Sequence, residues 1–153
     1  MKLKLLRPFP EKYPISSPFG KVRTLTIKGK TSVTAPHKGI DFAVPVGTDV
    51  RAMRDSAIYM VGWEAAPSLY PEDYQARGLG LRIWTKFDYN GVKIFAWYGH
   101  LSSVDPGIIP YYKIKEGEII GKSGNTGHSD GPHCHVQFRV VNTAEMLDSE
   151  FYL

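Results

Sequence analysis

Two short motifs hold side chains that could bind a metal ion. His133 and His135 stand two residues apart in GPHCHVQF, and His37 and Asp41 stand four apart in PHKGIDF. Side chains at i and i+2 of a strand point to the same face, so both histidines of the first motif can face one site while Cys134 faces away. A catalytic zinc ion takes three protein ligands, typically imidazole and carboxylate, and keeps a fourth position open. His37, Asp41 and either His133 or His135 would supply that set.

The histidine left out of the set would lie beside the metal-bound water. There a neutral imidazole near its ordinary pKa can move protons at physiological pH. Each motif alone has an ordinary explanation, since a histidine next to Pro or Gly is usually a turn or surface residue. Both motifs in one short chain favour the metal site. His128 lies in a stretch rich in Gly, Ser and Asp, so we expect it in a solvent-exposed loop.

The elements that must position these residues are strands. Eleven prolines and fifteen glycines interrupt the chain at short intervals, which disfavours helices. Alternation and β-branched or aromatic content predict strands at residues 24–27, 81–85, 92–98, 118–120 and 134–140. We therefore expect an all-β, mainly antiparallel fold.

An Asn-Gly pair at residues 90 and 91 predicts a hairpin between 81–87 and 92–98. Strict alternation along the second strand puts Phe95 and Trp97 on one face. It puts four residues on the other: Ile94, Ala96, Tyr98 and His100. His100 would then lean into the metal cleft if the neighbouring strand is the one that carries His133 and His135.

Length and composition bound the protein class. With 153 residues, of which 42% are hydrophobic, we expect a single domain over residues 1–153, with 1–14 as an N-terminal extension. The formal charge of +4 favours anionic partners. The basic residues are scattered apart from Lys2, Lys4 and Arg7, so we predict no nucleic-acid binding. Nothing in the sequence indicates an oligomer.

The single cysteine, Cys134, excludes an internal disulfide. Strand geometry turns it away from its two histidine neighbours, so we interpret it as a small buried hydrophobic residue and not a nucleophile. No apolar stretch approaches the roughly 18 residues of a membrane span. Pro8 and Pro10 interrupt the start of the chain, so we expect no signal peptide.

At the histidine motifs the chain resembles a known family, the lysostaphin-like zinc metallopeptidases or LytM-domain endopeptidases, which cut the peptide part of bacterial peptidoglycan. The resemblance runs from about residue 15 to the C-terminus. It includes, in the family's order, ISSPFG, HKGIDFAVPVGTDVRA, WYGHLS, EGEIIGKSGNTG and GPHCHVQF. It implies a mainly antiparallel sheet of the barrel-sandwich hybrid type and one Zn²⁺ per chain. It also assigns five residues: metal ligands His37, Asp41 and His135, and catalytic imidazoles His100 and His133.

The chain departs from the usual family pattern in a few places. Cys134 and Val136 replace a leucine and an aromatic residue of the common HLHF, and their parity predicts that both pack in the core. No tyrosine lies between Gly20 and His37, where members that cut glycine bridges can carry one. That weakens a prediction of glycine-bridge specificity.

Several loop residues are further candidates for substrate contact. The segment KIKEGEIIGKSGNTG is typical of the glycine hairpins of biotinyl and lipoyl barrels, so its first role is architectural. The loops at about 63–78 and 102–113 exceed common connection lengths and could wall the groove. We predict four substrate-binding residues: Tyr98, Asn125, Tyr111 and Tyr112.

The resemblance implies a zinc-dependent endopeptidase acting on peptidoglycan stem peptides or cross-bridges, of the endolysin type if its origin is a phage. It would reach the wall by lysis, by delivery on a virion or as part of a longer exported protein. One alternative is a non-catalytic LytM-like module that regulates another wall hydrolase. Such modules typically lack one or more ligands, and here every position is filled. A third hypothesis, suggested by the glycine hairpin, is a biotinyl-like carrier or purely structural barrel, which would bind no metal.

Overall fold

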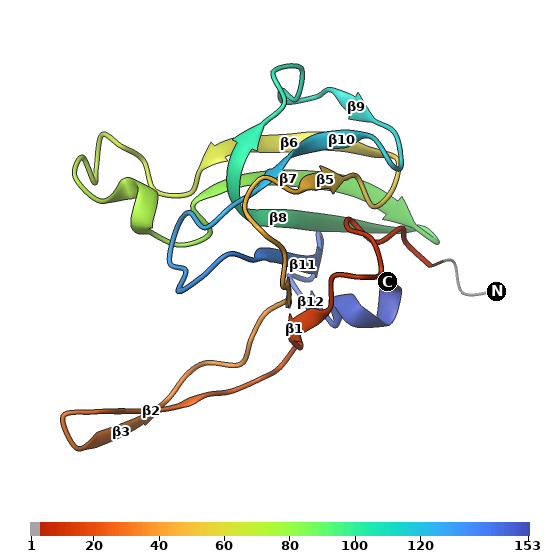
Figure 1. Cartoon of the computed structure of the whole chain (residues 1–153). Coiled ribbons are helices and arrows are strands. Elements are labelled where there is room, and N and C mark those ends of the chain that lie inside the picture. The colour runs from red at the N-terminus through yellow and green to blue at the C-terminus, as the bar shows by residue number, and fades with distance from the viewer. Residues whose placement is uncertain (1–3) are drawn as a thin grey trace.

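A computed structural model describes residues 4–153, apart from the side chains of residues 25–27. Its main element is one sheet in the order β1 (Ile15–Ser17), β4 (Ile40–Phe42), β11 (Cys134–Val140), β8 (Val92–Val104), β7 (Leu81–Tyr89), β6 (Ser56–Trp63) and β9 (Lys113–Ile114). Off this path, β10 (Ile119–Ser123) joins β8 to β5 (Asp49–Arg51), and β12 (Met146–Leu147) pairs with β11. Strands β2 (Thr24–Ile27) and β3 (Lys30–Val33) form a separate hairpin that projects from the body (Figure 1).

All of the strand pairs are antiparallel, and the two helical elements are short 3-10 turns, η1 (Tyr74–Ala76) and η2 (Ser149–Tyr152). The expected all-β, mainly antiparallel class is confirmed. The predicted strand 134–140 has the bounds of β11, and the predicted hairpin joins β7 to β8. Asn90 and Gly91 both have positive φ, as the Asn-Gly signal requires of a two-residue turn.

The inner face of the sheet forms the hydrophobic core. Alternate residues of β11, namely Cys134, Val136 and Phe138, are fully buried, and Tyr98 lies opposite Val136 on β8. This confirms that the departures at 134 and 136 pack in the core. Burial also raises the pKa of the Cys134 thiol, which makes it inert.

The described part of the N-terminal extension belongs to the same body. Leu5 and Phe9 are buried in the core cluster, and the Leu5 amide donates to the carbonyl of Tyr152 at 2.7 Å. Lys2, one of the basic residues grouped at the start of the sequence, lies outside the described residues. No helix within residues 4–153 has the length and apolar character to cross a membrane.

Gly39 allows β4 to lie close to β11 where the metal motifs meet. A Cβ atom built on Gly39 would lie 2.2 Å from the carbonyl oxygen of Val136 and 2.7 Å from Cβ of Gln137. The backbone cannot move away without breaking the β4–β11 pairing. We expect Gly39→Ala to lower the free energy of unfolding by about 3 kcal/mol, measured by urea denaturation.

Gly107→Ala is the matched control for this prediction. Nothing lies within 4 Å of a Cβ at Gly107, and its φ lies outside the left-handed range. Its free energy of unfolding should stay within about 0.5 kcal/mol of the wild type. Equal effects of the two substitutions would contradict the close-approach argument.

Candidate metal centre

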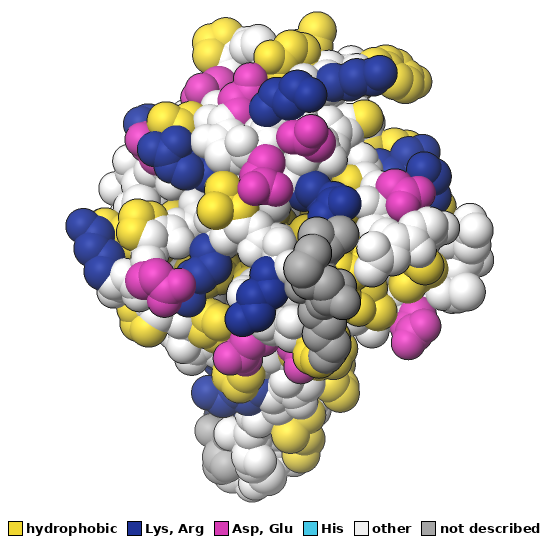
Figure 2. Space-filling view, turned by 90° about the vertical axis from the view of Figure 1, so that its right-hand side faces the viewer, with side chains coloured by type: hydrophobic (Ala, Val, Ile, Leu, Met, Phe, Trp, Pro, Cys, Tyr) yellow, Lys and Arg dark blue, Asp and Glu magenta, His cyan; other side chains and the backbone are white. Residues whose placement is uncertain are grey.

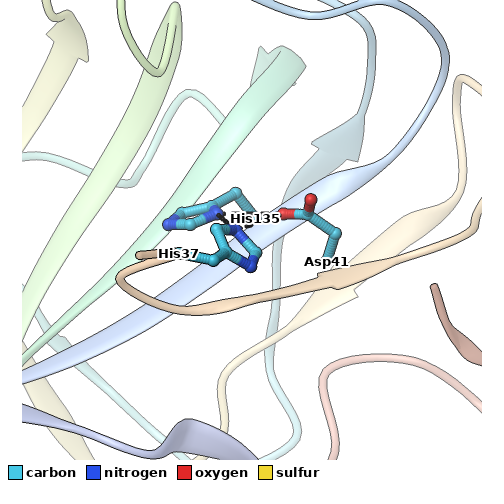
Figure 3. Close-up of side chains that lie close together, drawn as sticks. All are labelled: His37, Asp41 and His135. Carbon is cyan, nitrogen blue, oxygen red and sulfur yellow. Dashed lines mark hydrogen bonds and ion pairs between the residues drawn. The ribbon is translucent and has the colours of Figure 1, made fainter. Parts of the chain in front are cut away.

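Three side chains from two neighbouring strands and the loop before them converge at one point. His37 precedes β4, Asp41 lies on β4, and His135 lies directly opposite Asp41 on β11. Nδ1 of His135 is 2.9 Å from Oδ1 of Asp41 and 3.1 Å from Nε2 of His37, and the His37 and Asp41 atoms are 3.3 Å apart (Figure 3). The register of β4 against β11 therefore brings the two sequence motifs together.

The spacing of these three atoms fits a zinc ion. Tetrahedral zinc with bonds of about 2.0 Å separates its ligand atoms by about 3.3 Å. The second nitrogen of each imidazole is already occupied. Nδ1 of His37 donates to the carbonyl of Pro18 at 3.0 Å, and Nε2 of His135 donates to Oε1 of Gln137 at 2.9 Å. In the neutral rings, Nε2 of His37 and Nδ1 of His135 therefore carry no hydrogen, and their lone pairs lie close to the Asp41 carboxylate. A bound cation would stabilise these three electron-pair donors.

The ionisation of Asp41 suits the same role. Burial alone would raise its pKa, but the hydrogen bonds with His135 and His37 outweigh burial and hold the pKa well below the usual range. The pKa of His37 is raised, chiefly by its hydrogen bond with Asp41. Without a metal, a proton on His37 can therefore supply the positive charge that the carboxylate attracts.

His100 reaches the site through a break in the alternation of β8. The register of β8 against β7 shifts between the pairs at Leu81 and Ile83, and His100 has a φ of +59°. Tyr98 faces the core together with Ala96, but the extra residue turns His100 to the outer face, where its ring centroid is 4.4 Å from that of His133. The expectation that His100 shares a face with Tyr98 is wrong, because a bulge resets the parity.

His100 and His133 present similar nitrogens. Nδ1 of His100 donates to the carbonyl of Thr126 at 2.6 Å, and Nδ1 of His133 donates to the carbonyl of Gly131 at 2.8 Å. In each neutral ring, Nε2 then carries no hydrogen and can accept a hydrogen bond or a proton. Nε2 of His133 lies 3.8 Å from Oδ1 of Asp41, so both imidazoles stand beside the three-ligand set without completing it.

The five side chains share one groove of about 700 Å³. The base of the β2–β3 hairpin, Gly78 and Leu79, and the loop 128–132 complete its wall. The groove therefore brings together a candidate metal site and two further imidazoles.

The model of Peptidase family M23 matches residues 35–147, which is most of the chain and includes this whole set of side chains. The chain belongs to peptidase family M23. The resemblance found at the histidine motifs is thereby confirmed.

Three curated relatives indicate how this M23 domain compares. It is 36% identical over 132 residues to an uncharacterized metalloprotease of Haemophilus influenzae, covering 85% of this chain and 23% of that protein. It is 38% identical over 107 residues to lysostaphin of Staphylococcus simulans, covering 70% of this chain and 18% of lysostaphin. It is 35% identical over 104 residues to the DD-carboxypeptidase/endopeptidase Mpg of Neisseria gonorrhoeae, covering 68% of this chain and 20% of Mpg. The chain thus spans between a sixth and a quarter of the length of these three relatives.

The fold agrees with a solved structure. The catalytic domain of lysostaphin from Staphylococcus simulans superposes on the M23 domain with a TM-score of 0.68 at 30% identity, covering 92% of each chain. This match carries the fold over to nearly the whole of the chain.

Of the two long loops that we expected to wall the groove, only the end of the first one lines it. Gly78, at the end of the first long loop, lines the groove, and its carbonyl accepts from the amide of His128. His128 is exposed, as predicted, and also lines the groove. The second long loop is shorter than expected because β8 continues to Val104.

The predicted substrate-binding residues lie elsewhere. Tyr98 is buried, with its hydroxyl accepting from the amide of Met53, so the prediction that it contacts substrate is wrong. The described residues that line the groove do not include Asn125, Tyr111 or Tyr112. Asn125 instead accepts from the Ser129 hydroxyl at 2.6 Å, which supports the loop that leads to His133.

Sequence reasoning missed the residues that orient the imidazoles. The carbonyls of Pro18 and Thr126 leave no side-chain signal. Gln137, at i+2 from His135, shares its strand face and could have been inferred from that spacing. Lys21 and Arg23 also line the groove and were missed, because they lie in the segment before β2, whose position relative to the site cannot be inferred from the sequence.

The buried state of His100 predicts a pH dependence of stability. Burial, and next the charge of His133, lower its pKa from 6.5 to about 4. The unfolded chain keeps a pKa near 6.5 and binds more protons below it, so stability is lost as pH falls from 6.5 towards 4. We expect His100 to contribute a loss of about 3 kcal/mol over this interval. Urea unfolding at pH 7 and pH 4 should show a smaller loss for His100→Asn, and equal losses would contradict the assignment.

Proposed function

We propose that the protein is a zinc-dependent endopeptidase that hydrolyses peptide bonds of bacterial peptidoglycan. The observation that carries the proposal is the convergence of Nε2 of His37, Oδ1 of Asp41 and Nδ1 of His135 beside two further imidazoles. Membership of family M23 and the likeness to lysostaphin and Mpg support a peptidase acting on the wall. His37, Asp41 and His135 would hold the ion.

Zinc bound by these ligands would supply Lewis acidity towards a carbonyl oxygen and lower the pKa of water towards about 7. The chain's own residues then move the protons. Nε2 of His100 or His133 accepts a proton from the attacking water and afterwards returns it to the leaving amine. Burial lowers the pKa of His100 and so disfavours its charged form, and Nε2 of His100 positions the water by accepting a hydrogen bond from it.

The test has two measurements on the purified protein. Elemental analysis should find about one zinc per chain. Digestion of purified walls, both the thin kind and the thick kind, should release fragments whose masses identify the bond that is cut. A zinc-loaded protein that releases nothing from either wall would refute the peptidase proposal.

A non-catalytic LytM-like regulator is the rival function. Such a module would need no complete set of ligands and no imidazoles directed at them. Here the second nitrogens of His37 and His135 are held by Pro18 and Gln137, and this orientation suits a bound ion. We therefore favour the enzyme.

A further inference from the structure

We propose that Lys21 and Arg23 bind a carboxylate of the substrate, so that this M23 domain cleaves acidic stem peptides in preference to uncharged glycine bridges. The proposal rests on the proposed peptidase function and specifies its substrate class.

The first observation is the charge of the segment around the projecting hairpin. Residues 12–40 contain no Asp or Glu and six basic residues: Lys12, Lys21, Arg23, Lys28, Lys30 and Lys38. The whole chain has a formal charge of only +4, so the remainder is net negative. Figure 2 shows basic and acidic side chains interspersed over the face that lies to the right in Figure 1. Four of the six basic residues lie on or directly beside the β2–β3 hairpin, which projects from the body (Figure 1): Lys21, Arg23, Lys28 and Lys30.

Two of these cations belong to the groove itself. Lys21 and Arg23 line it together with His37 and Asp41, and both side chains are exposed. Within the described part of the chain, no acidic side chain forms an ion pair with either of them. Lys93 and Lys115, by contrast, pair with Asp88 and Asp55. The two groove cations are available to an anionic ligand.

The main chain fixes their position relative to the metal ligands. The amide of His37 donates to the carbonyl of Lys21 at 3.0 Å, and the amide of Gly20 donates to the carbonyl of His37 at 2.8 Å. The amide of Arg23 donates to the hydroxyl of Thr34 at 2.9 Å. A carboxylate bound here would lie beside the scissile bond.

The chemistry of the two side chains selects the ligand. A guanidinium binds a carboxylate through two parallel hydrogen bonds, and an ammonium adds a point charge. The stem peptides of peptidoglycan carry free carboxyl groups, whereas a glycine bridge has none along its length. The missing tyrosine between Gly20 and His37 agrees with this preference.

The experiment compares two synthetic cross-linked stem-peptide dimers that differ only in their free carboxyl groups, which are carboxylates in one and carboxamides in the other. We expect the zinc-loaded protein to cleave the carboxylate dimer with a kcat/KM about five- to tenfold higher. The ratio should fall as NaCl is raised from about 0.05 to about 0.5 M. In the double variant Lys21→Gln/Arg23→Gln, with zinc content and unfolding midpoint checked, the ratio should fall to about one.

Lys30→Gln is the matched control, since it removes a positive charge from β3 of the same hairpin without touching the groove. It should retain the preference. A wild-type ratio of one would overturn this inference while leaving the peptidase proposal intact, whereas no cleavage of either dimer or of purified walls would overturn the peptidase proposal itself. If Lys30→Gln loses as much preference as a single substitution at Lys21 or Arg23, the hairpin acts as a general polyanion attractor and the assignment of a carboxylate site is wrong.

Discussion

Asp41→Asn is expected to abolish zinc binding and wall hydrolysis together. The substitution keeps the size of the side chain but removes the only negative charge among the three ligands, whose atoms lie 2.9 to 3.3 Å apart. A neutral amide is a much weaker zinc ligand than a carboxylate. After dialysis, zinc should fall from about one per chain to below about 0.1, and the rate of wall hydrolysis by more than about 10³-fold.

Asp73→Asn is the control for this experiment, because Asp73 is an exposed carboxylate that pairs with Arg77. It should keep its zinc and its rate. An Asp41→Asn protein that still binds one zinc per chain would mean that the ion, if bound, is held elsewhere.

His100→Asn is expected to separate chemistry from metal binding. Asparagine tolerates the positive φ at this position, and its amide can replace Nδ1–H as the donor to the carbonyl of Thr126. The substitution shortens the side chain and removes the Nε2 acceptor. Zinc content should be unchanged while kcat falls about 10²- to 10⁴-fold, because the attacking water loses the acceptor that orients it for proton transfer.

His128→Asn tests whether the effect of His100→Asn is specific. His128 lines the same groove but is exposed, and none of our assigned roles uses it. It should keep most of the wild-type rate. Full activity of His100→Asn would show that His100 takes no part in the reaction.

The amino-acid sequence carries the strands and the metal ligands in local patterns. The i, i+2 spacing of His133 and His135 needs only the alternation of a strand, and β11 has the predicted bounds. β4, which carries Asp41, has three residues and is too short for alternation to reveal. The choice of His135 over His133 as ligand depends on the register of β11 against β4, and register is a property of two strands together.

The errors have the same physical origin. Alternation correctly put Tyr98 on the face of Ala96, but the expected position of His100 assigned that face to the cleft, whereas it is the core. Alternation could not place His100, because the bulge that turns this residue outward arises where β8 pairs with β7. The sequence of neither strand reveals that bulge. Groove walls are equally non-local, since Lys21, Gly78 and His133 come from three distant segments.

The hydrogen bond between Leu5 and Tyr152 bears on how the protein can be re-engineered. It ties the two ends of the described chain to each other, and Figure 1 shows the C-terminus on the side away from the β2–β3 hairpin. A targeting module fused at either end would emerge from one common point and leave the groove open. A short peptide should also join the two ends of the described chain, so new ends can be opened at the Asn90-Gly91 turn in a circular permutant.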